Sequence, residues 1–136
     1  MRTRLFALFL LLSSVSLVSC QQDSTDDVRP ATEILQDSWT WQQSSGGFTG
    51  QVLTPAGTGD QQQLEFGPDG QVRRYRNGRL LGTDSYTVRR GTSVIDGQTA
   101  FIIRYGSGLA QSALVGGSHL TLRDEVADGQ QHEYNR

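Results

Sequence analysis

Residues 64–81 read LEFGPDGQVRRYRNGRLL, and this stretch decides the fold class. Leu64 and Phe66 flank Glu65, which places two apolar side chains on one face of a strand and a carboxylate on the other. The motifs PDG and NG that follow are turn signals, and Asn-Gly readily adopts the positive backbone angles of a two-residue hairpin. The stretch therefore predicts short antiparallel strands joined by tight turns.

The same pattern of short alternating segments recurs along the chain. Trp39 and Trp41 share a predicted face with Gln43, and glycine-containing turn signals punctuate the segments from residue 46 to residue 129. Six to eight short strands leave many open edges, which closure into a barrel removes. We expect an all-β fold, a small antiparallel up-and-down β-barrel, with a β-sandwich as the alternative. Only residues 32–37 favour a helix.

An apolar run ends at Cys20, the only cysteine in the chain. Residues 1–19 combine two arginines, an apolar stretch and small residues before the cysteine, which are the three parts of a secretory signal. The stretch 5–18 is shorter than the about 20 apolar residues of a spanning helix. The motif LVSC at 17–20 is typical of a bacterial lipobox, so we expect removal of 1–19 and acylation of Cys20. The alternative is an unmodified thiol in an ordinary secreted protein.

A polar segment follows the cysteine. Residues 20–31 contain few apolar side chains and predict a lipid-bearing, disordered tether, whereas residues 32–136 form the predicted barrel domain. Gln21 resembles the residue that follows the cysteine in outer-membrane lipoproteins. The acidic cluster at 23–27 resembles a surface-export signal, with a merely soluble linker as an equal alternative. We therefore expect a lipid-anchored outer-membrane protein that faces either the periplasm or the cell surface.

Composition excludes several function classes. Loss of Arg2 and Arg4 with the signal takes the formal net charge from −2 to −4, which disfavours nucleic-acid binding. The chain contains no lysine, so it lacks a Schiff-base residue and the lysine of a phosphate-binding loop. Its glycine-rich segments at 46–50 and 57–60 lack the spacing of a dinucleotide fingerprint. We expect no cofactor, and no disulfide once Cys20 is acylated.

A resemblance to a known family rests on turns and aromatic residues spread over nearly the whole predicted domain. It is carried by Trp39-Thr40-Trp41, Gly46-Gly47-Phe48, Leu64-Glu65-Phe66, Pro68-Asp69-Gly70, Tyr75-Arg76-Asn77-Gly78, Leu120-Thr121-Leu122 and Tyr134-Asn135-Arg136. With these the chain resembles the small lipocalin-like domain lipoproteins of Bacteroidota. The resemblance implies a compact lipocalin-like barrel and no catalytic residues.

Two sets of aromatic residues are candidate site residues. As in lipocalins, a first-strand tryptophan accompanies a last-strand arginine, so we expect Arg136 to lie across Trp39 or Trp41 as a structural clamp. The second set either lines a pocket for a small apolar or amphipathic ligand or simply fills the barrel, since about eight strands leave room for little more than side chains. Its members are Phe66, Tyr75, Tyr86, Phe101 and Tyr105.

Six arginines fall within 18 residues of the sequence. They form a candidate anion patch for phosphate or carboxylate groups, because the guanidinium group is a planar bidentate donor. The alternative, which we favour, is an exposed hairpin whose arginines add solubility and pair with Asp69 or Asp84. The six are Arg73, Arg74, Arg76, Arg79, Arg89 and Arg90.

The remaining polar residues do not form a recognisable catalytic or metal site in the sequence. His119 and His132 lie on separate predicted strands without cysteine partners, so we expect no metal site. The carboxylates at 124–128 alternate too poorly for a calcium loop. We expect a monomeric protein without enzyme activity that binds a small hydrophobic ligand. The alternative is a filled barrel that contacts proteins, glycans or lipid head groups through its loops and arginines.

Overall fold

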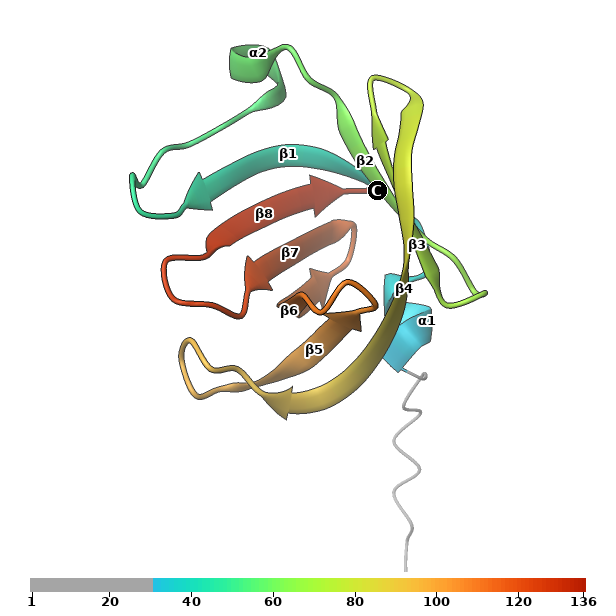
Figure 1. Ribbon diagram of the computed structural model, residues 1–136, viewed down its shortest axis with the longest axis vertical. Helices are drawn as coiled ribbons and strands as arrows, with labels where there is room; N and C mark the ends of the chain where they lie inside the picture. Colours follow the sequence, from blue (N-terminus) through green and yellow to red (C-terminus); the bar gives the residue numbers. More distant parts are fainter. Residues whose placement is uncertain (1–30) are drawn as a thin grey trace, which may run out of the picture.

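Eight antiparallel strands close into a barrel in the computed structural model, which describes residues 31–136 (Figure 1). The expected signal peptide, the lipidation site Cys20 and the tether up to residue 30 lie outside the described residues. The elements in chain order are α1 (Ala31–Leu35), β1 (Ser38–Gly46), α2 (Pro55–Thr58), β2 (Gln62–Phe66), β3 (Gln71–Arg76), β4 (Arg79–Thr92), β5 (Thr99–Tyr105), β6 (Ala110–Gly116), β7 (His119–Asp124) and β8 (Gln130–Asn135).

Each strand pairs with the next one, and β1 pairs with β8 to close the ring. The predicted up-and-down barrel is therefore confirmed over the sandwich alternative. The long strand β4 is shared between two neighbours, because its first half pairs with β3 and its second half pairs with β5. This offset gives the strands the stagger that a closed barrel requires. In Figure 1, β4 curves from the upper right to below β5.

The predicted Asn-Gly hairpin joins β3 to β4. Asn77 and Gly78 have φ angles of 50° and 75°, as a two-residue turn with matching twist requires. The Asn77 side chain also accepts a hydrogen bond of 2.8 Å from the backbone N–H of Gln61, which ties the turn to the start of β2. The local sequence thus determines this connection.

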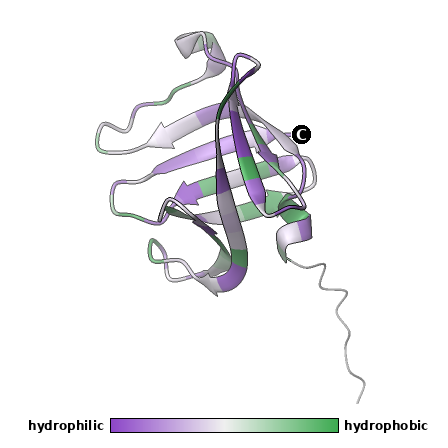
Figure 2. Ribbon diagram, turned by 45° about the vertical axis from the view of Figure 1, so that its right-hand side comes forward, coloured by the Kyte–Doolittle hydropathy of each residue, from purple (hydrophilic) through white to green (hydrophobic). Residues whose placement is uncertain are grey.

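The barrel interior is filled by apolar side chains. Trp39, Ile103 and Leu120 are completely buried. Phe66 packs edge-on against Tyr86, with ring centroids 5.0 Å apart and an interplanar angle of 82°. In Figure 2 several strands carry both hydrophilic and hydrophobic residues, as expected when one face of a strand points inward and the other meets solvent.

A β-bulge in β1 changes which side chains face inward. The pairing with β8 shifts between Trp41 and Gln43. Gln43, predicted to share the tryptophan face, instead donates a hydrogen bond of 2.9 Å to Glu133. Ser44 takes the buried position and is 5% exposed. The extra residue of the bulge breaks the period of two that the sequence prediction assumed.

Helix α1 packs against one end of the barrel. Leu35 at its end is buried in the core, and its carbonyl oxygen accepts a hydrogen bond of 2.8 Å from Nε1 of Trp39. The connections that follow β1, β4 and β7 lie together on the left of Figure 1, whereas α1 lies on the right. The barrel therefore has one end occupied by a helix and one surrounded by loops.

Candidate functional site

The candidate ligand-lining aromatics do not share one cavity. Phe66, Tyr86 and Tyr105 are buried in the packed core, and the hydroxyl of Tyr86 donates to the carbonyl oxygen of Gly67 at 2.9 Å. Only Phe101, at the start of β5, lines a pocket described below. For the first three residues the structure shows the filling alternative.

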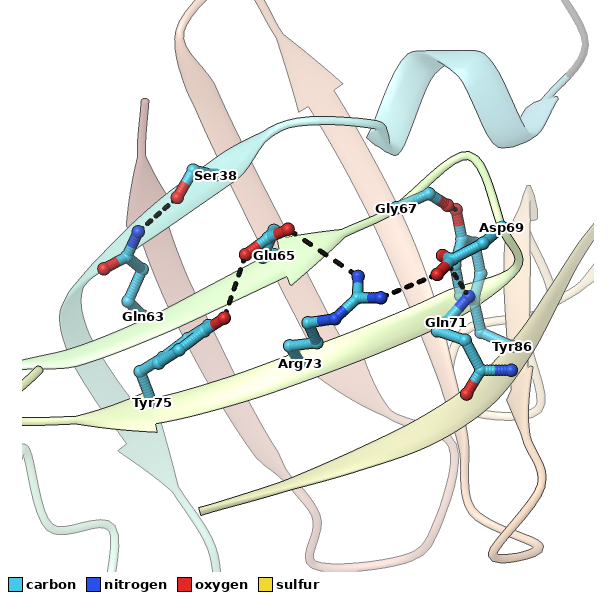
Figure 3. Close-up of polar contacts among 9 residues, drawn as sticks. All are labelled: Ser38, Gln63, Glu65, Gly67, Asp69, Gln71, Arg73, Tyr75 and Tyr86. Atoms are coloured by element: carbon cyan, nitrogen blue, oxygen red, sulfur yellow. Dashed lines mark hydrogen bonds and ion pairs between the residues drawn. The ribbon is translucent and has the colours of Figure 1, made fainter. Parts of the chain in front are cut away.

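Tyr75 lies outside the barrel, which corrects the prediction that it lines the interior. It pairs across the strands with Gln63, and Gln63 alternates with the inward-facing Leu64. The Tyr75 hydroxyl donates to Glu65 at 3.1 Å, and this bond raises its pKa (Figure 3). Val72 faces inward and Tyr75 lies three residues further along β3, so strand alternation places its ring on the outer face.

Arg136 lies across the ring of Trp39, one of the two tryptophans considered for the clamp. Its guanidinium carbon is 5.1 Å from the ring centroid. The same group donates to Asp37 at 3.0 Å and to the carbonyl oxygen of Gly117 at 2.7 Å. Trp41 has a different role, since its Nε1 donates to Ser44. Arg136 therefore connects the last strand to the segment before β1 and to the β6–β7 turn.

The barrel interior also holds a chain of polar side chains, which we call the inner polar chain. Ser44 accepts the N–H of Trp41 at 2.8 Å, and its hydroxyl lies 2.7 Å from Nδ1 of His132. On the other side of the ring, Nε2 of His132 lies 3.7 Å from Asp124. Burial lowers the pKa of His132, and the charge of Asp124 opposes that effect. The members are Trp41, Ser44, His132, Asp124, Gln111 and Tyr105.

The far half of the inner polar chain is equally well connected. Asp124 accepts hydrogen bonds from Gln111 at 2.8 Å and from the backbone N–H of Gln130 at 3.0 Å. Gln111 in turn accepts the hydroxyl of Tyr105 at 2.7 Å. Burial raises the pKa of Tyr105, and it raises the pKa of the neighbouring Tyr134 to about 12. Every buried side-chain polar atom in residues 31–136 has a hydrogen-bond partner. The inner polar chain is therefore a fully hydrogen-bonded part of the core.

The serine, histidine and aspartate of this chain resemble a hydrolytic triad only in residue type. Ser44 is 5% exposed, and its hydroxyl already accepts the indole N–H of Trp41. The 3.7 Å between His132 and Asp124 is too long for the hydrogen bond that orients a catalytic base. We therefore interpret the three residues as structural.

The six arginines of the candidate anion patch are divided between the two faces of the barrel, so they do not form one patch, and the pairing of Arg73 with Asp69 agrees with the favoured alternative. Arg73 points outward and pairs with Asp69 at 2.6 Å and with Glu65 at 3.6 Å (Figure 3). The hydrogen bond from Arg73 holds the pKa of Asp69 below its usual range. Arg74 pairs across the strands with Leu64 and therefore points inward.

Three other members are also accounted for by their surroundings. The guanidinium group of Arg74 lies 5.2 Å from the ring centroid of Tyr105. Arg76 lies 3.6 Å from Asp60, and Arg79 is exposed beside the Asn-Gly turn. Alternation along β3, which sequence proximity conceals, separates Arg74 and Arg76 from Arg73.

Two arginines of the predicted patch combine with a third that the sequence analysis missed. Arg89 and Arg90 lie on β4, and Arg104 lies beside them on β5. Among residues 31–136, no carboxylate oxygen lies within 4.0 Å of any of these three guanidinium groups. They line a groove of about 410 Å³ together with Gly91, Val94 and Ile102, which we call the arginine groove.

A second pocket lies where the pairing of β5 with β6 ends. The last cross-strand pair is Phe101 with Ala113, and beyond it the two strands share no ladder. The pocket measures about 460 Å³, within the usual size of small-molecule sites. We call it the Phe101 pocket, and its lining includes Arg90, Phe101, Ala113, Leu114, Thr121 and Arg123.

The loop at 93–98 runs between these two depressions. Glu125 accepts hydrogen bonds from the Ser93 hydroxyl at 2.8 Å and from the backbone N–H of Val94 at 2.6 Å. Asp96 pairs with Arg123 at 2.8 Å. These contacts hold the loop against the outer face of the barrel, with Arg90 lining both the groove and the pocket.

The two histidines do not form a metal site together. Nδ1 of His119 lies 2.5 Å from the amide oxygen of Asn135, whereas His132 belongs to the inner polar chain. No group of three or more metal-ligating side chains occurs in the described part of the chain. No helix between residues 31 and 136 has the length and apolar character to cross a membrane.

Comparison of the chain with protein-family models, with curated proteins and with solved structures gives no match. Function is therefore argued from the side chains of the barrel and its surface.

Proposed function

We propose that this protein is a lipid-anchored cell-envelope protein whose barrel binds one small amphipathic ligand in the Phe101 pocket. The observation that carries the ligand-binding part is the contrast between the packed interior and this pocket. Phe101 and the exposed Leu114 contribute apolar side chains to its lining, while Arg90 adds a cation. The expected site thus moves from the barrel centre to its wall.

Lipid anchoring rests on the sequence that precedes the barrel. The LVSC motif, the apolar stretch before it and the polar segment after it support acylation of Cys20, and two or more acyl chains anchor a protein stably. Labelling of cells with an alkynyl fatty acid tests this part. We expect label on the wild-type protein and none on Cys20→Ser, whereas equal labelling of both would contradict the proposal.

Ligand binding is tested with N-phenyl-1-naphthylamine, a neutral apolar fluorophore. We expect saturable enhancement of its fluorescence by the protein and weaker binding by Leu114→Ala, because Leu114 is 72% exposed and lines the pocket. The matched control is Leu109→Ala, since Leu109 is 61% exposed and is not among the residues that line the pocket. Equal loss in both variants, or no binding by the wild type, would contradict a ligand site at Phe101.

The second candidate function is contact with another envelope component through the loops. Phe48, Val94 and Val126 are strongly exposed on three loops. Backbone hydrogen bonding links the first and third loops, since the N–H of Gly47 donates to Gly129 at 3.1 Å. Native mass spectrometry of the protein isolated from its own host separates the two functions. A co-purifying small molecule supports ligand binding. Its absence, together with an envelope component that co-purifies with the wild type and is lost in Phe48→Ser, supports contact through the loops.

A further inference from the structure

We propose that the arginine groove binds the anionic head, a phosphate or a carboxylate, of an amphipathic ligand whose apolar part occupies the Phe101 pocket. This inference rests on the proposed function, because it names the chemical class of the ligand for the same region. It places the head on the outer face of β4 and β5, outside the barrel interior.

The strand register brings the arginines together. Arg89 pairs across the strands with Ile102, and Arg104 pairs with Thr87. Arg89 and Arg104 are therefore diagonal neighbours on the same outer face, at a spacing that long side chains bridge. Two guanidinium groups at this spacing present convergent N–H donors to one anionic group.

The charge state of the groove favours an anion. Four other arginines of the described chain have carboxylate partners, namely Arg73, Arg76, Arg123 and Arg136. Arg89, Arg90 and Arg104 have none within 4.0 Å among residues 31–136. The carboxylate that lines the groove, Glu125, is occupied by its two donors from Ser93 and Val94.

Apolar residues also line the groove. They include Ile102, Val94 and Gly91. A Cβ atom at Gly91 would lie 3.1 Å from Cγ1 of Ile102, so the glycine keeps this part of the groove clear. An anionic head bound here also buries the apolar atoms next to it.

Arg90 connects the groove to the Phe101 pocket. Its guanidinium carbon lies 5.4 Å from the centroid of the Phe101 ring, and the residue lines both depressions. The segment from Thr92 to Val94 passes between them. Arg90 pairs across the strands with Phe101, on the face opposite to Arg89 and Arg104, so a ligand with its head against these two arginines reaches the pocket by crossing the segment at residues 92–94.

The test compares dodecyl phosphate with dodecanol, which share a chain length and differ in charge, as competitors of N-phenyl-1-naphthylamine on the full chain carrying Cys20→Ser. We expect dodecyl phosphate to compete at about tenfold lower concentration, as one charge-assisted hydrogen bond implies. The double variant R89Q/R104Q is expected to lose that preference and to keep its affinity for dodecanol. The matched control R79Q removes an exposed arginine outside the groove and is expected to keep the preference.

The outcomes separate this inference from the proposed function. If the neutral fluorophore binds but the wild type does not distinguish phosphate from alcohol, the groove inference is wrong and ligand binding stands. Retention of the preference in R89Q/R104Q also overturns the inference. If the fluorophore does not bind, the proposed function fails. In that case a titration with dodecyl phosphate, followed by the amide chemical shifts of Gly91 and Ile102, tests the anion site directly. Shift changes that occur in the wild type and are lost in R89Q/R104Q support the site, and shift changes that are the same in both proteins overturn it.

A second arm distinguishes a free amphipath from a lipid head group in a bilayer. Sedimentation with vesicles of phosphatidylglycerol and phosphatidylcholine is compared between the same chain with and without R89Q/R104Q. A deficit of the double variant on these vesicles assigns the site to bilayer lipids. If the two proteins sediment equally and R89Q/R104Q differs from the parent chain only in its binding of monomeric dodecyl phosphate, the site is assigned to a free ligand.

Discussion

The hydroxyl oxygen of Ser44 lies 2.7 Å from Nδ1 of His132, although 88 residues separate them in the chain. Because an indole N–H only donates, Ser44 accepts from Trp41 and is free to donate its own proton to the neutral imidazole. The bulge in β1 places the serine at this position, opposite β8. One hydroxyl therefore provides a hydrogen-bond partner for the buried indole of Trp41 and for the partly buried imidazole of His132, at the seam that closes the barrel.

Replacement of this hydroxyl is expected to destabilise the barrel. In Ser44→Ala the N–H of Trp41 and Nδ1 of His132 both lose their partner, and each buried unpaired group costs about 1–3 kcal/mol. Urea unfolding followed by tryptophan fluorescence measures the change. Ser45→Ala is the control, since the Ser45 hydroxyl makes no hydrogen bond within residues 31–136. An equal loss of stability in the two variants would show that Ser44 acts through general packing alone.

The stability of the barrel is expected to fall on mild acidification. Burial lowers the pKa of His132 below its ordinary value of about 6.5, so the unfolded chain binds a proton more readily than the folded one. The contribution of His132 to the free energy of unfolding is fully present above about pH 6.5. It decreases as the pH falls from that value towards the lower pKa that His132 has in the folded state. Urea midpoints between pH 5 and pH 8 should show a smaller slope for His132→Gln than for wild type, and identical slopes would contradict this assignment.

The contact of Arg136 with Trp39 is expected to stabilise the barrel. Arg136→Ala removes a cation-π contact, which contributes about 0.5–2 kcal/mol, together with the pairing to Asp37. We expect a lower melting temperature in a calorimetric scan. Arg79→Ala, an exposed arginine beside a turn, is the control. An unchanged melting temperature for Arg136→Ala would sink the structural-clamp hypothesis.

The Asn-Gly turn is expected to require its glycine for backbone reasons alone. Gly78 has a φ of 75°, and a Cβ there would meet no atom within 4 Å. Gly78→Ala therefore isolates the cost of a left-handed residue with a side chain, about 1–2 kcal/mol. Gly82 has equal space and no positive φ, so Gly82→Ala is expected to be neutral or slightly stabilising. Equal effects of the two variants on the urea midpoint would contradict the backbone explanation.

The sequence by itself determined the fold class, since turns and strand alternation are local properties. Asn77-Gly78 adopts the predicted turn, and apolar residues such as Leu64 and Phe66 point inward as their spacing predicts. The proximity of Trp39 on β1 to Arg136, which directly follows β8, also follows from an up-and-down order that closes on itself. These features depend on the backbone angles of turns and on the alternation of side chains between the two faces of a strand. Both are determined by a few neighbouring residues.

Only the tertiary structure decided which distant residues meet. The bulge in β1 brought Ser44 to His132, and the pairing of β4 with β5 joined Arg104 to Arg89, whereas Arg73 found carboxylates and Arg74 turned inward. A shift of one residue in register or one extra residue in a strand moves a side chain to the opposite face. Such shifts depend on how the whole barrel packs and closes, so the location of the candidate site emerged from the stagger of the strands.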